Sequence, residues 1–158
     1  VDHGFTYVED GFRFTDLSRR FGLHTFGTLE TRYSGSTALF NDTPGGGTRL
    51  ERVDGTPFDI TSIKLAELNG NQVATVTVTG YLKGGGTTVQ AFTLDGNAFG
   101  QECFSFNETF VARDRLEWGQ ASPFHQFDNL VVDAVPEPGT LALLGLGLGV
   151  FALRRRRK

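Results

Sequence analysis

The chain has 158 residues, enough for one domain with its own hydrophobic core. Its formal net charge is -3, but five of its 15 Lys and Arg residues stand together at positions 154–158. Residues 1–153 therefore carry 10 bases against 18 acids, a net charge of -8. An acidic body of this kind excludes the basic surface that nucleic-acid-binding domains need, so we expect no nucleic-acid partner.

The composition favours β-structure with tight turns, because 21 glycines and 15 phenylalanines accompany many Thr and Val residues. Cys103 is the single cysteine, so no internal disulfide can form. It stands beside Phe104 and near Phe106, and we expect its thiol to be buried. The chain contains no methionine and begins at Val1. We expect the complete protein to carry an export signal before this residue.

Short strands are predicted along residues 1–56, where the chain is rich in loops. "DG" pairs at Asp10-Gly11 and Asp54-Gly55 and the glycine-rich run at 41–47 indicate turns between them. The strand candidates are residues 5–8, 12–15, 37–40 and 48–53.

The strand signal is denser in residues 57–133. Residues 72–82 alternate strictly, with threonines on one face and apolar residues on the other, which is typical of a strand with one buried side. The apolar phase of residues 58–68 slips near Thr61 and Ser62, which predicts a β-bulge. The other candidates in this part are residues 87–97, 103–107, 110–119 and 124–133.

About nine short strands with glycine-rich turns, and no helical period before the tail, predict an all-β fold. An antiparallel sandwich or barrel fits this pattern, and we favour a two-sheet β-sandwich of the jelly-roll type over residues 1–134. Its predicted core consists of Phe58, Ile60, Ile63, Leu65, Val76, Val78, Phe92, Leu94, Phe104, Phe106, Leu116, Trp118 and Phe127.

The C-terminal segment differs from the rest of the chain. Residues 141–153 carry no charge, and as a hydrophobic helix they would span roughly 20 Å. This is shorter than the hydrocarbon core of a bilayer, at about 30 Å. A basic cluster follows and would stay on the cytoplasmic side, which places the domain outside. The cluster is Arg154, Arg155, Arg156, Arg157 and Lys158.

Pro136, Glu137 and Pro138 precede this apolar segment, and the three parts together resemble a PEP-CTERM sorting signal over residues 135–158. The same kind of tail is also labelled an ice-binding protein C-terminal domain. The resemblance implies an exported protein of a Gram-negative bacterium that makes exopolysaccharide. Its partner would be an exosortase, a membrane protease that cuts at Pro136–Pro138 after transient inner-membrane anchoring from the periplasmic side. A permanent membrane anchor is the alternative.

The body is similar to the β-sandwich found upstream of many such tails, through "EDGFRFT", "GSTALFND" and "FDITSIKLAEL". That family usually has a further strand before the point where this chain begins. The closing "FDNLVVD" also resembles the last strand of jelly-roll carbohydrate-binding modules. These resemblances imply a cell-surface or matrix protein that associates with exopolysaccharide or biofilm and binds glycan.

No catalytic motif stands out, so we expect no enzyme. G-x-S-x-G, H-E-x-x-H and C-x-x-C are missing from the sequence, and the glycine-rich run at 41–47 lacks the lysine of a phosphate-binding loop. The alternative is a small polysaccharide-active hydrolase that uses two carboxylates. The carboxylates available for this chemistry are Glu9, Asp10, Asp114, Glu117 and Asp128.

Two binding sites are considered. Asp128, with Glu9 or Asp10 brought near it by packing of the first and last strands, resembles the structural calcium site of carbohydrate-binding jelly rolls. Alternatively, Asp128 makes hydrogen bonds to the backbone at a strand edge. For glycan stacking we consider Tyr81, at a strand end, and Trp118, whose alternation with Leu116 also fits a core position.

Overall fold

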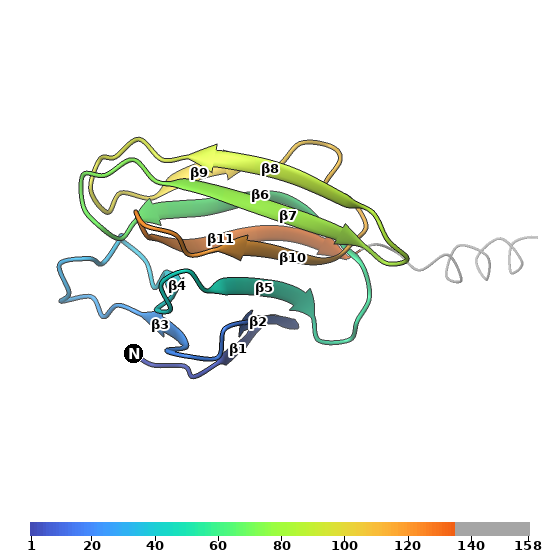
Figure 1. The fold of residues 1–158 in the computed structure, drawn as a ribbon, viewed down its shortest axis with the longest axis horizontal. Helices are drawn as coiled ribbons and strands as arrows, with labels where there is room; N and C mark the ends of the chain where they lie inside the picture. The colour runs from blue at the N-terminus through green and yellow to red at the C-terminus, as the bar shows by residue number, and fades with distance from the viewer. Residues whose placement is uncertain (135–158) are drawn as a thin grey trace, which may run out of the picture.

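The computed structural model describes residues 1–134, and this part of the chain forms strands but no helix (Figure 1). The all-β prediction is confirmed for it. The strands are β1 (Thr6–Glu9), β2 (Phe12–Asp16), β3 (Leu23–Thr25), β4 (Leu39–Asn41), β5 (Gly47–Arg52), β6 (Phe58–Glu67), β7 (Thr75–Leu82), β8 (Thr87–Thr93), β9 (Glu102–Ser105), β10 (Arg113–Gly119) and β11 (His125–Ala134).

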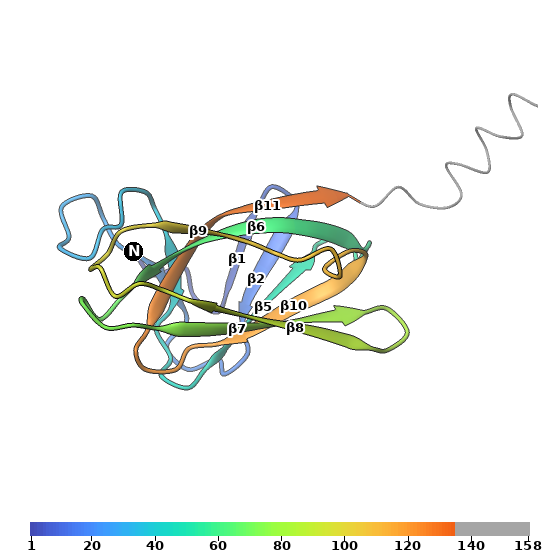
Figure 2. The ribbon, with the colours of Figure 1, turned by 90° about the horizontal axis from the view of Figure 1, so that it is seen from above.

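All eleven strands belong to one connected antiparallel sheet. The main path runs β1-β2-β5-β10-β6-β11-β4-β3, while β7 and β8 extend from β10 and β9 pairs with β6. The two halves of the sheet meet at a single residue pair, Arg113 of β10 with Phe58 of β6. Figure 2 shows the sheet curling over itself into a nearly closed, barrel-like shape. The two separate sheets of a jelly roll are not confirmed.

The hydrophobic core lies between the curled halves of the sheet. Every residue predicted for the core is buried except Phe104, which is half-buried and packs against the cluster. Aromatic rings tie the halves together: Trp118 of β10 meets Phe127 of β11 edge to face with their centroids 4.9 Å apart. Phe12 of β2 packs in the same manner on Phe58 of β6 at 5.2 Å. Such contacts add about 1 kcal/mol each to the burial of apolar area.

The β-bulge predicted in the sixth strand is confirmed. Ser62 pairs with Val131 and Ile60 pairs with Val132, so Thr61 has no partner of its own in β11. Thr61 is exposed, whereas Ile60 and Ile63 on either side of the bulge are both buried. The extra residue therefore keeps both apolar sets of this strand on the core side.

The Asp10-Gly11 turn is also confirmed, as the connection of the β1–β2 hairpin. Asp10 has a φ of 49° and Gly11 a φ of 79°. Two consecutive residues with positive φ are what a two-residue hairpin turn of type I′ requires, and Asp-Gly is the dipeptide that adopts it most readily.

The prediction for Cys103 is wrong, because its side chain is exposed. Cys103 lies on β9 between Glu102 and Phe104, both of which are half-buried, and the strand period of two turns its thiol to the opposite face. The prediction failed because Phe104, next to Cys103 in the sequence, lies on the opposite face of the strand and does not show where the thiol points.

Within residues 1–134, no helix is long and apolar enough to cross a membrane. The predicted C-terminal helix, the Pro136–Pro138 motif and the basic cluster Arg154–Lys158 lie outside the described residues.

Candidate functional site

A concave pocket of about 380 Å³ opens between the β1–β2 hairpin and β11. Its floor is apolar and buried, formed by Phe14, Leu39, Leu50 and Phe127. Its rim is polar and mostly exposed. The rim residues are Glu9, Asp10, Ser36, Thr37, Asp128 and Asn129. A cavity of this size with an apolar floor and a few convergent polar groups has the character of a small-molecule site.

The structure brings the three carboxylates of the predicted calcium site, Glu9, Asp10 and Asp128, to this one pocket. The oxygens of Asp128 are already engaged, however. Oδ2 accepts hydrogen bonds from Ser36 Oγ and from Gln101 Nε2, the latter at 3.0 Å, and Oδ1 accepts one from the backbone N–H of Asn129 at 2.8 Å. Only the Asn129 donor is a backbone group, and β11 pairs with β6 and β4 rather than lying at a sheet edge, so this bonding differs from the backbone hydrogen bonds at a strand edge that the alternative expected.

Tyr7 of β1 also lines the pocket, and sequence reasoning did not select it. Burial raises the pKa of its hydroxyl, and the negative charge of the Glu9 carboxylate acts in the same direction. Its ring lies 4.8 Å from that of His3 and 6.3 Å from that of Phe14. Tyr7 is thus a half-buried aromatic that lines the pocket together with the carboxylate of Glu9. Its alternation with Thr6 and Val8 was the signal that could have revealed it.

The two aromatics predicted to bind glycan lie elsewhere. Trp118 is only 3% exposed and packs on Phe127, so it is a core residue and cannot stack on a sugar. Tyr81 is half-buried, and the guanidinium of Arg115 lies 4.0 Å from its ring centroid. Neither residue lines the pocket.

The carboxylate of Glu117 stands in an ion-pair network rather than facing a second acid. Arg49 donates to it at 2.9 Å and Arg115 at 3.0 Å. Burial acts to raise the pKa of Glu117, but the hydrogen bonds from the two arginines outweigh it and hold the pKa below its ordinary value. A general acid needs the opposite shift.

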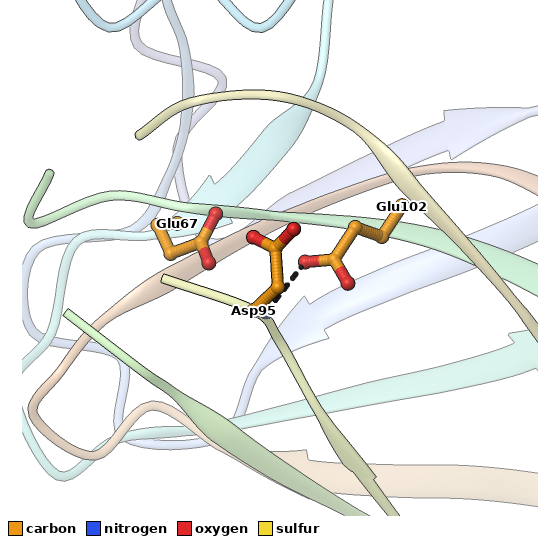
Figure 3. Close-up of side chains that lie close together, drawn as sticks. All are labelled: Glu67, Asp95 and Glu102. Atoms are coloured by element: carbon orange, nitrogen blue, oxygen red, sulfur yellow. Dashed lines mark hydrogen bonds between the residues drawn. The ribbon is translucent and has the colours of Figure 1, made fainter. Parts of the chain in front are cut away.

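Three other carboxylates converge at one end of the sheet (Figure 3). Glu67 ends β6, Asp95 lies in the loop after β8, and Glu102 begins β9. One oxygen from each lies within 4.8 Å of the others, and within residues 1–134 this is the group with the spacing of a metal site. Sequence reasoning missed this group because its members are far apart in the chain.

Comparison with known proteins supports the reading of the tail. The PEP-CTERM protein-sorting motif matches residues 134–157, which include Pro136, Glu137, Pro138 and the arginines 154–157. No curated protein and no solved structure matches the chain. The resemblance of the body to carbohydrate-binding jelly rolls and the ice-binding label are therefore not confirmed. The matched motif indicates an exported protein with a C-terminal signal for exosortase-dependent sorting.

Proposed function

We propose that the domain is a non-catalytic glycan-binding module, delivered to the cell surface or matrix by its sorting tail. The observation that carries this proposal is the pocket lined by Tyr7, which combines an aromatic ring and an apolar floor with a rim of carboxylate, amide and hydroxyl groups. A sugar ring needs both features, because its C–H face packs on apolar and aromatic surface while its hydroxyls exchange hydrogen bonds with polar groups.

The charge of the rim narrows the class of glycan. Glu9, Asp10 and Asp128 give the pocket three acidic side chains, and none of the residues lining it is Lys or Arg. Acidic sugars such as uronates would meet like charges here, so the pocket favours neutral sugars or amino sugars. Exopolysaccharide that contains such sugars would hold the protein in the matrix.

Binding suits these side chains better than catalysis. Asp128 accepts hydrogen bonds from Ser36, Gln101 and Asn129. Groups held in this manner are oriented to receive sugar hydroxyls. A glycosidase instead needs one carboxyl group kept protonated by a raised pKa.

The test is a glycan array probed with the full chain in mild detergent, compared with Tyr7→Ala and with Tyr81→Ala as the matched control. We expect binding to neutral or amino-sugar glycans, a loss of at least about tenfold in affinity for Tyr7→Ala, and wild-type binding for Tyr81→Ala. The proposal fails if Tyr7→Ala binds as well as the wild type, or if acidic glycans are the preferred ligands.

We further infer that the tail holds the protein at the inner membrane, with the domain in the periplasm, until an exosortase cuts at Pro136–Pro138. The uncharged run and terminal basic cluster of the sequence support this order of events. Mass spectrometry of the protein from exporting cells is expected to find a mature C-terminus before residue 141. A mature chain that still contains Arg154 would instead establish the permanent anchor.

A further inference from the structure

We propose that Glu67, Asp95 and Glu102 form a Ca²⁺ site that fastens the loop between β8 and β9 to the end of β6. This site is separate from the pocket and from the carboxylates Glu9, Asp10 and Asp128, and it does not depend on glycan binding.

The backbone places the three side chains together. Leu65 of β6 pairs with Glu102 of β9, and Glu67 lies two positions beyond Leu65. Because side chains two apart share a face, Glu67 and Glu102 project to the same side of this strand pair. Asp95 enters from the loop after β8, whose backbone bends at Gly96 with a φ of 78°. Figure 3 shows the three carboxylates pointing toward one another.

Hydrogen bonds hold one oxygen of each carboxylate in place. The backbone N–H of Gly96 donates to Glu67 Oε1 at 2.7 Å, and that of Asp95 donates to Glu102 Oε1 at 3.0 Å. The N–H of Asn97 donates to Asp95 Oδ1 at 2.7 Å. The loop thus orients all three groups through its own backbone while leaving their second oxygens available.

The second oxygen of Glu67 is the observation that points to a ligand. Glu67 is fully buried, and no donor within residues 1–134 reaches its Oε2. A buried carboxylate oxygen without a partner costs several kcal/mol unless a cation or donor satisfies it. None of the ion pairs formed within these residues includes Glu67, Asp95 or Glu102. Three neighbouring acids therefore lack a basic side chain to balance them.

Electrostatics at Glu102 agree with this imbalance. Its pKa is raised, first by burial and then by the negative charges of Asp95 and Glu67, against the lowering effect of the hydrogen bond from Asp95 N–H. A divalent cation among the three groups would remove this repulsion.

The chemistry of the ligand atoms indicates which kind of ion the site would bind. All three ligands are carboxylate oxygens, which hard cations prefer, and the group contains no His or Cys that would favour zinc or copper. Two oxygens bound to one Ca²⁺ at about 2.4 Å can be at most about 4.8 Å apart. The spacing of the group meets this limit. Loop carbonyls and water can complete the coordination shell, and an exported protein encounters calcium at about millimolar concentration.

The test is thermal unfolding of the full chain in mild detergent, followed by circular dichroism after treatment with a chelator. Addition of about 1 mM CaCl2 is expected to raise the Tm of the wild type by about 5 °C or more, and an equal concentration of MgCl2 by much less. Asp95→Asn and Glu102→Gln are each expected to lose most of the calcium shift. Both side chains reach the surface, so these variants should fold.

Two controls make the result specific. Glu108→Gln removes an exposed carboxylate outside the group and is expected to keep the full calcium shift. Asp128→Asn is expected to keep it as well, because the pocket is a separate site. The inference is overturned if calcium leaves the wild-type Tm unchanged, if magnesium acts equally, or if Asp95→Asn retains the shift. Loss of the shift in Asp128→Asn alone would move the calcium site to the pocket.

Discussion

Burial of His125 is expected to lower the stability of the domain as the pH falls from the pKa of a free histidine, 6.5, to about 4. It begins β11, is 1% exposed, and its Nε2 has no hydrogen-bond partner within residues 1–134. Burial lowers its pKa from 6.5 to about 4, because the charged imidazolium would lose its hydration. The folded protein therefore keeps this ring neutral at pH values where the unfolded chain protonates it.

The sign and size of the effect follow from linkage. Between the two pKa values the unfolded state binds one more proton than the folded state, so the free energy of unfolding falls as the pH falls. A pKa of 6.5 in the unfolded chain and about 4 in the fold give a loss of about 2 kcal/mol at pH 5. The loss approaches about 3 kcal/mol as the pH nears 4 and is negligible above about pH 7.5.

Urea unfolding of wild type and His125→Leu, measured at about pH 7.5 and about pH 5, isolates this contribution. We expect the variant to lose about 2 kcal/mol less than the wild type between these pH values, since leucine has no proton to bind. His24→Leu is the control, because this ring is 24% exposed and lies near Asp2 at the surface. Parallel pH dependence in wild type and His125→Leu would refute the reasoning.

Three further predictions concern single side chains, each measured against the wild type. Asp16→Ala should lower the free energy of unfolding, measured by urea unfolding, by about 3 kcal/mol or more. The carboxylate of Asp16 is buried and accepts hydrogen bonds from Asn41 and Thr43 and from backbone N–H groups, among them that of Gly22. Gly80→Ala should cost about 1–3 kcal/mol in the same assay, because a Cβ would lie 2.9 Å from Arg113 Cδ and 3.1 Å from Phe110 Cε1. The Cys103 thiol should react with a maleimide in the native protein, and slow labelling that speeds up only on unfolding would show that it is buried.

The sequence predicted the long strands well because two periodic signals agreed in them. Residues 58–68 carried both the alternation of β6 and the phase slip at its bulge, and residues 124–133 covered nearly all of β11. β3 was missed because a strand of three residues, Leu23–Thr25, is too short to show any period. The joining of the halves into one sheet was also missed. It depends on one bridge between Arg113 and Phe58, and pairing partners so far apart leave no trace in a single sequence.

The candidate sites could be predicted only as far as they follow from the order of the strands, and not where they depend on loop courses or on the register of distant strands. Packing of the first and last strands was expected to bring Asp128 near Glu9 and Asp10, and all three do line one pocket. The partners that engage Asp128, Ser36 and Gln101, come from loops whose course no periodicity reveals. The carboxylate group at Glu67 is a stronger example, since it exists only because β9 pairs with β6 in one register.

The division between domain and tail has a structural consequence for sorting. β11 is an interior strand that pairs with β6 along most of its length and with β4, and it also lines the pocket. Its last residue is Ala134, two positions before Pro136. A cut within or after the Pro136–Pro138 motif therefore leaves intact the strands, the pocket and the carboxylate group that the structure describes within residues 1–134. Among the described residues, the contacts that define the two sites are all made upstream of the signal, so we expect both sites to persist after such a cut.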